Sequence, residues 1–215
     1  MPRGAWTEVP HHSAAKVRAM PSLALDWGGV LVTDGSLTAW SVLQERLGIP
    51  EREAATLWQD ELQVAADLGQ IAEEEIWKSL ASLRPGVAEN EIREIFLSQY
   101  VEIPHAIRTI SAAHAAGWQL VLATNNVRAW LTWWRKKYAW LDLFDEICCS
   151  SDLGVRKPDS EYYALLRAMM TERDGFFVDD KQVNVDAAAA AGFRAILADG
   201  DGFWSPPDAL LEIVS

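Results

Sequence analysis

The sequence predicts an α/β protein: a parallel β-sheet with helices on both faces, and a bundle of helices inserted after the first strand. From residue 104 onward, short apolar runs alternate with helical patterns, and repeated strand-helix units of this kind form parallel sheets. Residues 36–102 instead show helical spacing without a strand pattern. At 215 residues, the chain is long enough for one domain with a sizeable insertion.

The first strand is predicted at residues 23–25, a short apolar stretch between Pro21 and the pair Gly28-Gly29. Asp26 follows this strand directly. Ligands of open α/β sheets bind where the strands end, so a carboxylate at this point is a candidate for chemistry. A simple turn is the alternative, because Asp and Gly are common turn residues. Residues 1–20 show no sustained periodicity and are predicted to form a flexible leader.

Residues 36–102 are predicted to form about four short helices. Apolar residues recur there at intervals of three and four, as at Trp40 and Leu43, and glycine and proline residues separate the helical runs. A helical layer inserted directly after the first strand is placed to close over the edge of the sheet. We therefore predict a core formed by residues 21–35 and 103–215, with a helical cap formed by residues 36–102.

The rest of the chain supplies the other strands and their helices. Strands are predicted at residues 118–123, 144–149, 176–178 and 194–198, and helices at residues 107–116, 128–138, 160–170 and 187–191. Polar residues follow three of these strands: Thr124-Asn125, a loop containing Lys157, and Asp179-Asp180. Each alone could be a helix cap, a solvated charge or a turn. Because the carboxyl ends of parallel strands share one edge, these groups and Asp26 together indicate a functional site.

Composition argues against several classes of protein. The formal charge of −12 disfavours a nucleic-acid surface, which requires clustered Lys and Arg. The sequence contains no long apolar run of the kind that forms a membrane span or a signal peptide. We therefore expect a soluble, cytoplasmic protein. The adjacent Cys148 and Cys149 lack metal-ligand spacing and are predicted to be buried thiols. Tryptophans at residues 130–140 are predicted to pack in the core or in a subunit interface, which leaves a homodimer open.

Four segments together resemble the motifs of the haloacid dehalogenase-like (HAD) hydrolase superfamily. They are Asp26-Trp-Gly-Gly-Val-Leu, Thr124-Asn125, Gly154-Val-Arg-Lys157-Pro-Asp and Phe177-Val-Asp-Asp180-Lys-Gln-Val-Asn184. Their order and spacing agree as well, and the resemblance covers nearly everything after residue 21. The turn Gly69-Gln-Ile71 with the helix after it is similar to the cap of a subgroup that includes the phosphatase domain of epoxide hydrolases and sugar-phosphate phosphatases. The resemblance implies a Rossmann-like core with a helical cap.

The resemblance implies a Mg²⁺-dependent phosphatase that acts on a small phosphorylated metabolite. Asp26 would attack phosphorus in line and form an aspartyl phosphate, which water then hydrolyses. A divalent cation would relieve the repulsion between the carboxylates of Asp26, Asp179 and Asp180 and would offset the charge of the phosphate. The family takes another metal ligand from the backbone carbonyl two residues after the nucleophile, which here belongs to Gly28.

Other positions that match the motifs would bind or support the phosphate. Lys157 would neutralise its charge and keep Asp26 ionised, and Thr124 would donate a hydrogen bond to a phosphoryl oxygen. Asn184 would hold Lys157 or the surroundings of the metal in place. If two or more tryptophans face the cleft, the substrate carries an apolar or aromatic body. The predicted substrate contacts are Trp27, Asn125 and Asn126, with nearby amides at a helix start.

One departure from the family pattern affects the mechanism. Most phosphatases of the superfamily have a second Asp at the position of Gly28, where it protonates the leaving alcohol and later activates water. Losing a positioned acid and base costs about a hundredfold to ten-thousandfold in rate. Asp34 is the nearest replacement along the chain, but it is also placed to cap the next helix.

Three alternatives to a phosphatase remain open at this point. A phosphonoacetaldehyde hydrolase would use a cap lysine, and Lys78 is the only lysine in the predicted cap. A carbon–halogen hydrolase is disfavoured, because dehalogenases usually have Tyr at the position of Gly28 and lack the full acidic metal pair. A non-catalytic binding or regulatory protein would explain the missing acid, but not the retention of the other motif residues.

Overall fold

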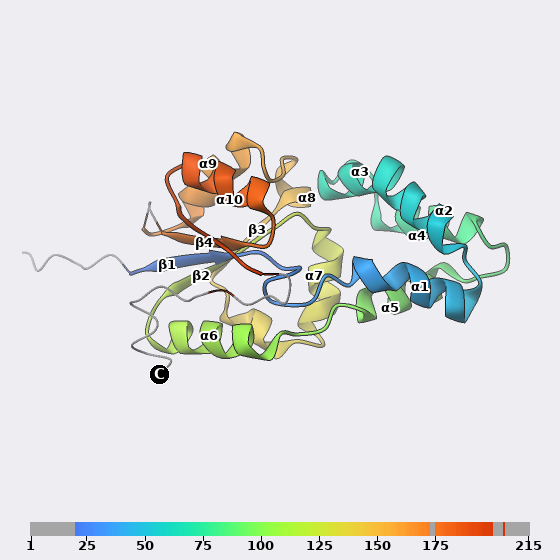
Figure 1. Cartoon of the computed structure of the whole chain (residues 1–215), viewed down its shortest axis with the longest axis horizontal. Coiled ribbons are helices and arrows are strands. Elements are labelled where there is room, and N and C mark those ends of the chain that lie inside the picture. The colour runs from blue at the N-terminus through green and yellow to red at the C-terminus, as the bar shows by residue number, and fades with distance from the viewer. Residues whose placement is uncertain (1–19, 173–174, 200–203, 205–215) are drawn as a thin grey trace, which may run out of the picture.

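In a computed structural model, the chain forms a five-stranded parallel sheet with helices on both faces, as the sequence predicts (Figure 1). The structure describes residues 20–172, 175–199 and 204, so the predicted leader lies outside the described residues except for Met20. The strand order is β3-β2-β1-β4-β5, and every neighbouring pair is parallel. The strands are β1 (Ser22–Leu25), β2 (Gln119–Thr124), β3 (Glu146–Cys149), β4 (Phe176–Asp179) and β5 (Arg194–Leu197).

The register of the three central strands brings their carboxyl ends to the same level. Leu25, the last residue of β1, pairs with Leu122 of β2 and with Val178 of β4. The backbone N–H of Asp26 then donates to the backbone oxygen of Val178 at 2.9 Å. Asp26 and the residues that follow β2 and β4 therefore leave the sheet at one edge, which is the edge that binds ligands in α/β proteins.

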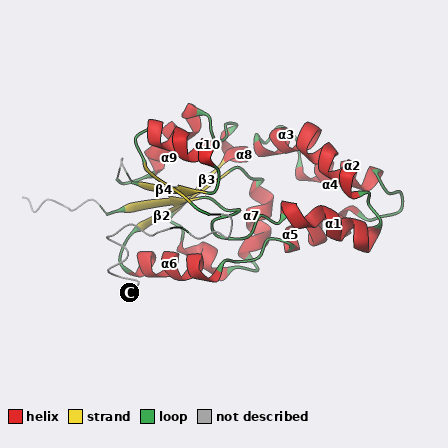
Figure 2. Ribbon diagram, viewed as in Figure 1, coloured by secondary structure: helices red, strands yellow, loops and turns green. Residues whose placement is uncertain are grey.

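In the described part of the chain, five helices surround the sheet: α6 (Pro104–Ala115), α7 (Arg128–Arg135), α8 (Ser150–Leu153), α9 (Ser160–Met169) and α10 (Gln182–Ala190). Alternate strand residues pack into two separate cores, because successive side chains of a strand point to opposite faces. Leu23 and Leu25 face α6 and α7, whereas Ala24 faces α9 and α10 (Figures 1 and 2). The short side chain of Ala24 leaves room for the buried rings of Tyr162 and Tyr163.

Between β1 and α6 the chain forms a separate layer of helices beyond the strand ends (Figure 1). Its elements are α1 (Ser36–Leu47), α2 (Glu51–Leu57), the π-helix η1 (Trp58–Leu62), α3 (Gln63–Asp67), α4 (Glu73–Ser82) and α5 (Glu89–Ser98). Because α2, η1 and α3 follow one another without a break, these elements make four helical segments, in agreement with the sequence prediction. We call this part of the molecule the helical layer.

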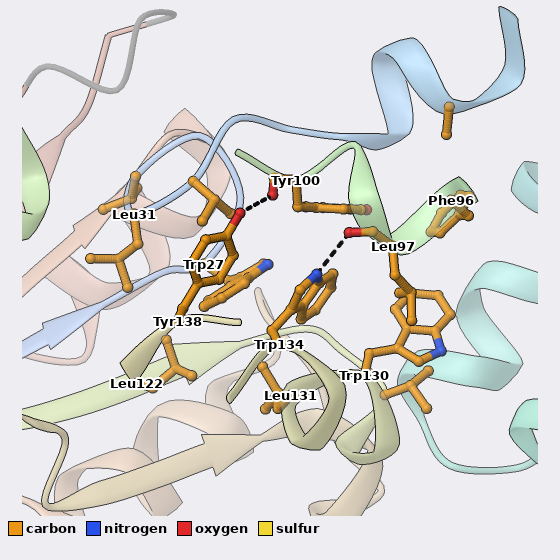
Figure 3. Close-up of a cluster of buried hydrophobic side chains, with 14 of the residues drawn as sticks. Trp27, Leu31, Phe96, Leu97, Tyr100, Leu122, Trp130, Leu131, Trp134 and Tyr138 are labelled. Carbon is orange, nitrogen blue, oxygen red and sulfur yellow. Dashed lines mark hydrogen bonds between the residues drawn. The ribbon is translucent and has the colours of Figure 1, made fainter. Parts of the chain in front are cut away.

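A cluster of aromatic rings fixes the helical layer to the core (Figure 3). Trp27, directly after the predicted nucleophile, stacks against Trp134 of α7 with ring centroids 4.7 Å apart. Trp134 Nε1 donates to the backbone oxygen of Leu97 in α5 at 2.9 Å. The hydroxyl of Tyr138 donates to the backbone oxygen of Tyr100 at 2.6 Å. The predicted core packing is therefore confirmed for Trp130 and Trp134, whereas Trp133 and Trp140 are only half-buried. The bond from Trp134 to Leu97 serves to orient α5.

Several predicted boundaries are wrong by a few residues. The helix predicted at residues 187–191 begins at Gln182, because Asn184 and Val185 are buried and pack against the core despite their weak helix propensity. The third strand begins at Glu146, because a 3₁₀ turn, η2 (Ala139–Leu143), precedes it. The helix predicted at residues 128–138 ends at Arg135, just before that turn. The first of these changes moves the predicted site residue Asn184 from a loop into α10.

Two further sequence predictions can be compared with the fold. Cys148 and Cys149 are both buried free thiols, as predicted. Among the described residues, no helix combines the length and the apolar character that crossing a membrane requires.

Candidate active site

A buried lysine links two carboxylates at the strand ends. Lys157 Nζ lies 2.9 Å from Asp26 Oδ1 and 2.6 Å from Asp179 Oδ2. It also donates to the backbone oxygen of Ala123 at 2.9 Å. Lys157 is only 1% exposed and Asp26 only 8% exposed. Three residues from separate segments thus form an ion-pair network that is largely shielded from water.

Burial and pairing act in opposite directions on this network. Burial raises the pKa of Asp26 to about 7; Lys157 opposes the rise, and Asp179 adds to it. Burial lowers the pKa of Lys157, but the carboxylates of Asp179 and Asp26 outweigh it and raise that pKa above its ordinary value. We favour the ionised pair, because all three close contacts of Lys157 Nζ are to oxygen atoms that stabilise an ammonium.

The residues after β2 position the network and line its surroundings. Asn125 exchanges two hydrogen bonds with the backbone of Lys157: Nδ2 donates at 2.9 Å and Oδ1 accepts at 2.8 Å. Asn126 Nδ2 donates to the hydroxyl of Thr124 at 3.4 Å. Thr124 is buried and lines the same cavity as Asp26. The side chain of Asn125 therefore holds the loop of Lys157, and its predicted contact with substrate stays a prediction, as does that of Asn126.

Three carboxylates gather at this edge: the oxygen atoms of Asp26, Asp179 and Asp180 lie within 4.8 Å of one another. Asp180 Oδ1 is buried and receives no hydrogen bond from any described residue. Asp180 also lies against Gly29, where an added Cβ would come within 2.6 Å of Asp180 Oδ2. Burial raises the pKa of Asp180, which Lys181 opposes and Asp179 reinforces. This clustering of acidic oxygens is the arrangement that a hard divalent cation relieves.

The carboxylates differ in their availability to a metal. Asp179 Oδ2 contacts Lys157, and its Oδ1 accepts hydrogen bonds from the backbone N–H of Lys181 and from Asn184 Nδ2, both at 2.9 Å. Asp180 Oδ1 accepts no hydrogen bond from the described residues, and Asp26 contacts Lys157 through Oδ1. Asp26 and Asp180 thus fit a magnesium ion better than Asp179 does. Asn184 donates to Asp179, and Asp179 contacts Lys157, so the predicted support of Lys157 by Asn184 would be indirect.

These residues line a small cavity of about 90 Å³ between the strand ends and the helical layer. Trp27 and Trp130 contribute apolar walls from the core, and Trp58 contributes one from the helical layer. The condition for a substrate with an apolar or aromatic body, that at least two tryptophans face the cleft, is therefore met. The remaining lining residues are Asp26, Gly28, Asp34, Ser36, Gln63, Asp67, Tyr100, Thr124, Asn125, Asn126, Lys157, Lys181 and Asn184.

Asp34 lies in this cavity wall but acts as a helix cap. Its Oδ1 accepts a hydrogen bond from the backbone N–H of Ser36 at 3.1 Å and another from the Ser36 hydroxyl at 2.6 Å. These bonds satisfy donors at the start of α1. Gly28 also lines the cavity, and an added Cβ there would meet only the Cα of Asp34, at 4.0 Å. The backbone around position 28 therefore leaves room for a side chain.

Sequence reasoning missed two charged residues of the cavity. Asp67, at the end of α3, is 5% exposed, and Lys181 directly follows Asp180. Arg156 Nη1 lies 3.3 Å from Asp67 Oδ2, which links the helical layer to the loop of Lys157. A signal was present, since Asp67 is an acid within an apolar helical run, two residues before the Gly69 turn. A single sequence does not show that this turn returns to the core.

Comparison with known proteins gives a consistent result. The sequence model of the haloacid dehalogenase-like hydrolases matches residues 20–192. A phosphoglycolate phosphatase of Cereibacter sphaeroides is 32% identical over 115 residues, which are 50% of this chain and 53% of that protein. The chain thus spans about half the length of the curated relatives it matches.

Solved structures agree in fold. A HAD family enzyme of Bacteroides thetaiotaomicron, in complex with magnesium and inorganic phosphate, superposes with a TM-score of 0.70 at 18% identity. That match covers 86% of this chain and 98% of the other. An L-2-haloacid dehalogenase of Xanthobacter autotrophicus has a TM-score of 0.61 at 16% identity and covers 83% and 77% of the two chains. At these identities the likeness concerns the fold alone.

Proposed function

Because the chain belongs to the haloacid dehalogenase-like hydrolases, we propose that it is a Mg²⁺-dependent phosphatase of a small phosphorylated metabolite. The observation that carries the proposal is the contact of Lys157 with both Asp26 and Asp179 at the base of the cavity. A buried cation beside a carboxylate at the end of a central strand is suited to an anionic substrate and a carboxylate nucleophile. The magnesium and phosphate in the structure of the Bacteroides enzyme support the same chemistry.

Each residue of the site would have a separate role in phosphoryl transfer. Asp26 Oδ attacks phosphorus, the bond between phosphorus and the leaving oxygen breaks, and an aspartyl phosphate remains on the enzyme. Lys157 offsets negative charge on the phosphoryl oxygens, and the hydroxyl of Thr124 donates to one of them. Asp26, Asp180 and the carbonyl of Gly28 would hold Mg²⁺, which supplies further positive charge against the phosphoryl group.

Cavity size and lining favour a small ester. The cavity of about 90 Å³ has room for a phosphoryl group beside Asp26, and it is narrow where the helical layer meets the strand ends. Trp58 and Trp130 stack with ring centroids 5.7 Å apart, so they present a continuous aromatic wall. We expect the organic part of the substrate to place an apolar face against this wall. The phosphoglycolate phosphatase relative supports a small substrate as a class, without identifying the ester.

The structure disfavours the phosphonoacetaldehyde alternative. A Schiff-base lysine from the helical layer would have to reach the cavity, and Lys78 is exposed on α4 and does not line it. Cleavage of a carbon–halogen bond and a purely binding role remain as outcomes of the experiment below.

The test is release of inorganic phosphate from 4-nitrophenyl phosphate, with and without MgCl₂, by the wild type and by Asp26→Asn. This leaving group needs little protonation, so the missing Asp at position 28 does not obscure the result. We expect Mg²⁺-dependent release by the wild type and none by the variant, with unchanged circular dichroism. No release by the wild type from this ester or from a panel of phosphate esters would contradict the proposal. A haloacid and phosphonoacetaldehyde complete the panel.

A further inference from the structure

We propose that Asp67, on the helical layer, is the acid and base that replaces the carboxyl group missing at position 28. This inference rests on the proposed phosphatase function and deepens it. Asp67 would protonate the leaving alcohol while Asp26 attacks phosphorus. It would then take a proton from the water that hydrolyses the aspartyl phosphate.

The position of Asp67 meets the first requirement, access to the reacting groups. Asp67 lines the same cavity of about 90 Å³ as Asp26, Thr124 and Lys157, but it comes from the helical layer whereas they come from the core. Residue 67 is only 5% exposed. In so small a space, a phosphoryl group bound at Asp26 directs its leaving oxygen toward the helical layer, because in-line attack places the leaving group opposite the nucleophile.

An unused oxygen is the second requirement. Asp67 Oδ2 is buried and receives no hydrogen bond from any described residue, although Arg156 Nη1 lies 3.3 Å away as its ion-pair partner. A buried carboxyl oxygen without a hydrogen-bond donor is unfavourable. The leaving hydroxyl or the attacking water could supply the missing partner.

The third requirement is a proton that can be given and taken near neutral pH. Burial raises the pKa of Asp67 to about 6, while Arg156, Lys181 and Lys157 oppose the rise in that order. Tyr100 completes the cavity wall on this side. An acid and base works best when its pKa lies near the operating pH. The environment of Asp67 provides such a value.

The fold also fixes the position of this carboxyl group. Gly69, two residues later, adopts φ +65°, and an added Cβ there would lie 2.3 Å from the backbone oxygen of Ser151 in α8. The end of α3 is therefore docked closely against the core. Arg156, which pairs with Asp67, directly precedes Lys157 in the sequence.

Asp34 is the competing candidate for this role. Its Oδ1 is engaged by both donors of Ser36, and its carboxylate closes the first turn of α1. Asp67 Oδ2 receives no hydrogen bond from the described residues and has only its ion-pair contact with Arg156. The geometry therefore favours Asp67.

Asp67 has the same protonation state at the beginning and at the end of one catalytic cycle. In the first step, protonated Asp67 gives its proton to the leaving oxygen as the Asp26 oxygen–phosphorus bond forms and the ester bond breaks. In the second, the Asp67 carboxylate takes a proton from water as the water oxygen attacks phosphorus. The Asp26 oxygen–phosphorus bond breaks, inorganic phosphate leaves, and Asp67 is protonated again.

The experiment compares Asp67→Asn with the wild type on two esters. With 4-nitrophenyl phosphate, transfer to Asp26 needs no acid, but hydrolysis of the aspartyl phosphate still needs the base. We expect a rapid burst of one equivalent of nitrophenol, followed by turnover slowed about 10²- to 10⁴-fold. With an alkyl phosphate both steps need Asp67, so we expect no burst and a comparable loss of kcat.

Three further variants separate this role from a structural one. Asp60→Asn changes an exposed acid of η1 that does not line the cavity, and it should leave both reactions unchanged. Arg156→Gln breaks the ion pair but keeps the acid. Because Arg156 lowers the pKa of Asp67, its loss should move that limb of the pH profile of kcat upward. Adding Gly28→Asp to Asp67→Asn should restore turnover of the alkyl ester.

The outcomes distinguish the two proposals. If the wild type hydrolyses both esters but Asp67→Asn loses them equally without a burst, or loses neither, Asp67 is not the acid and the phosphatase proposal stands. The same conclusion follows if Asp34→Asn, which can still cap α1, produces the expected pattern instead. If the wild type releases no phosphate from any ester, the proposed function itself is wrong.

Discussion

Gly69 lies where the helical layer docks on the core, so the substitution Gly69→Ala tests the docking directly. An added Cβ would lie 2.3 Å from the backbone oxygen of Ser151 and 3.2 Å from its carbonyl carbon. Real Cβ contacts are not shorter than 3.0 Å, so the two segments would have to separate by at least about 0.7 Å. Backbone atoms cannot rotate away as a side chain can, and the end of α3 would move with the turn.

The magnitude has two parts, and Gly86 separates them. Both glycines have positive φ, +65° at Gly69 and +94° at Gly86, and a left-handed conformation costs an Ala residue about 1–2 kcal/mol. Around Gly86 no atom lies within 4 Å of an added Cβ, so Gly86→Ala carries this backbone term alone. Gly69→Ala adds the displacement of α3. A misplacement of about 1 Å can lower a rate roughly a hundredfold.

The assay measures kcat/KM for an alkyl phosphate and the free energy of unfolding in denaturant for both variants. We expect Gly86→Ala to lose about 1–2 kcal/mol of stability. Gly69→Ala should lose more, because the contact with Ser151 must also give way. Only Gly69→Ala should also lose activity, by about tenfold to a hundredfold, because Asp67 moves away from the substrate. Equal activity of the two variants would refute the reasoning that close docking of residues 67–69 positions a catalytic group.

Three more predictions follow from buried charges and thiols. Lys157→Met leaves Asp26 and Asp179 buried without their cation, so it should lower the free energy of unfolding by about 3–5 kcal/mol. The control is Lys78→Met, which changes an exposed lysine and should have almost no effect. A loss below about 1 kcal/mol for Lys157→Met would count against the network. The raised pKa of Asp67 means that the folded protein binds the Asp67 proton more tightly than the unfolded chain does. The stability of the wild type should therefore fall as the pH rises from 3.8 to about 6. Over the same rise in pH, Asp67→Asn should gain up to roughly 3 kcal/mol relative to the wild type in denaturant unfolding. A constant difference between the two proteins would show that Asp67 ionises freely. Burial raises the pKa of Cys148 to about 11, so mass spectrometry should find its thiol unalkylated by iodoacetamide at pH 8 until denaturant unfolds the chain, and rapid alkylation of the native protein would contradict this.

The strands and the strand-end residues could be predicted because their signals are local. The apolar stretch at Leu23–Leu25 ends on Asp26, and Phe177-Val178 ends on the acidic pair, so parallel pairing alone brings the carboxylates together. Element boundaries were less accurate where tertiary contacts outweigh propensity. Asn184, for example, lies in a helix turn that its hydrogen bond to Asp179 stabilises, although Asn is a weak helix former.

The opposite wall of the cavity could not be predicted, since it depends on how two layers meet. Asp67 stands out in the sequence as an acid within an apolar helical run, but nothing local shows which surface buries it. Its burial, its pairing with Arg156 and its place in the cavity all depend on the close approach at Gly69. The roles of Asn125 and Asp34 were ambiguous in the sequence as well. Their hydrogen-bond partners, Lys157 and Ser36, are known only from the folded structure.

The central claim is that Asp26 becomes covalently phosphorylated at a Mg²⁺-dependent site. The direct measurement is to quench the wild type in acid during turnover of 4-nitrophenyl phosphate, to reduce the acyl phosphate with borohydride, and to identify the modified residue by mass spectrometry. We predict homoserine at position 26, formed only when MgCl₂ is present and absent from Asp26→Asn. Modification of any other residue, or undiminished phosphate release by Asp26→Asn, would contradict the account.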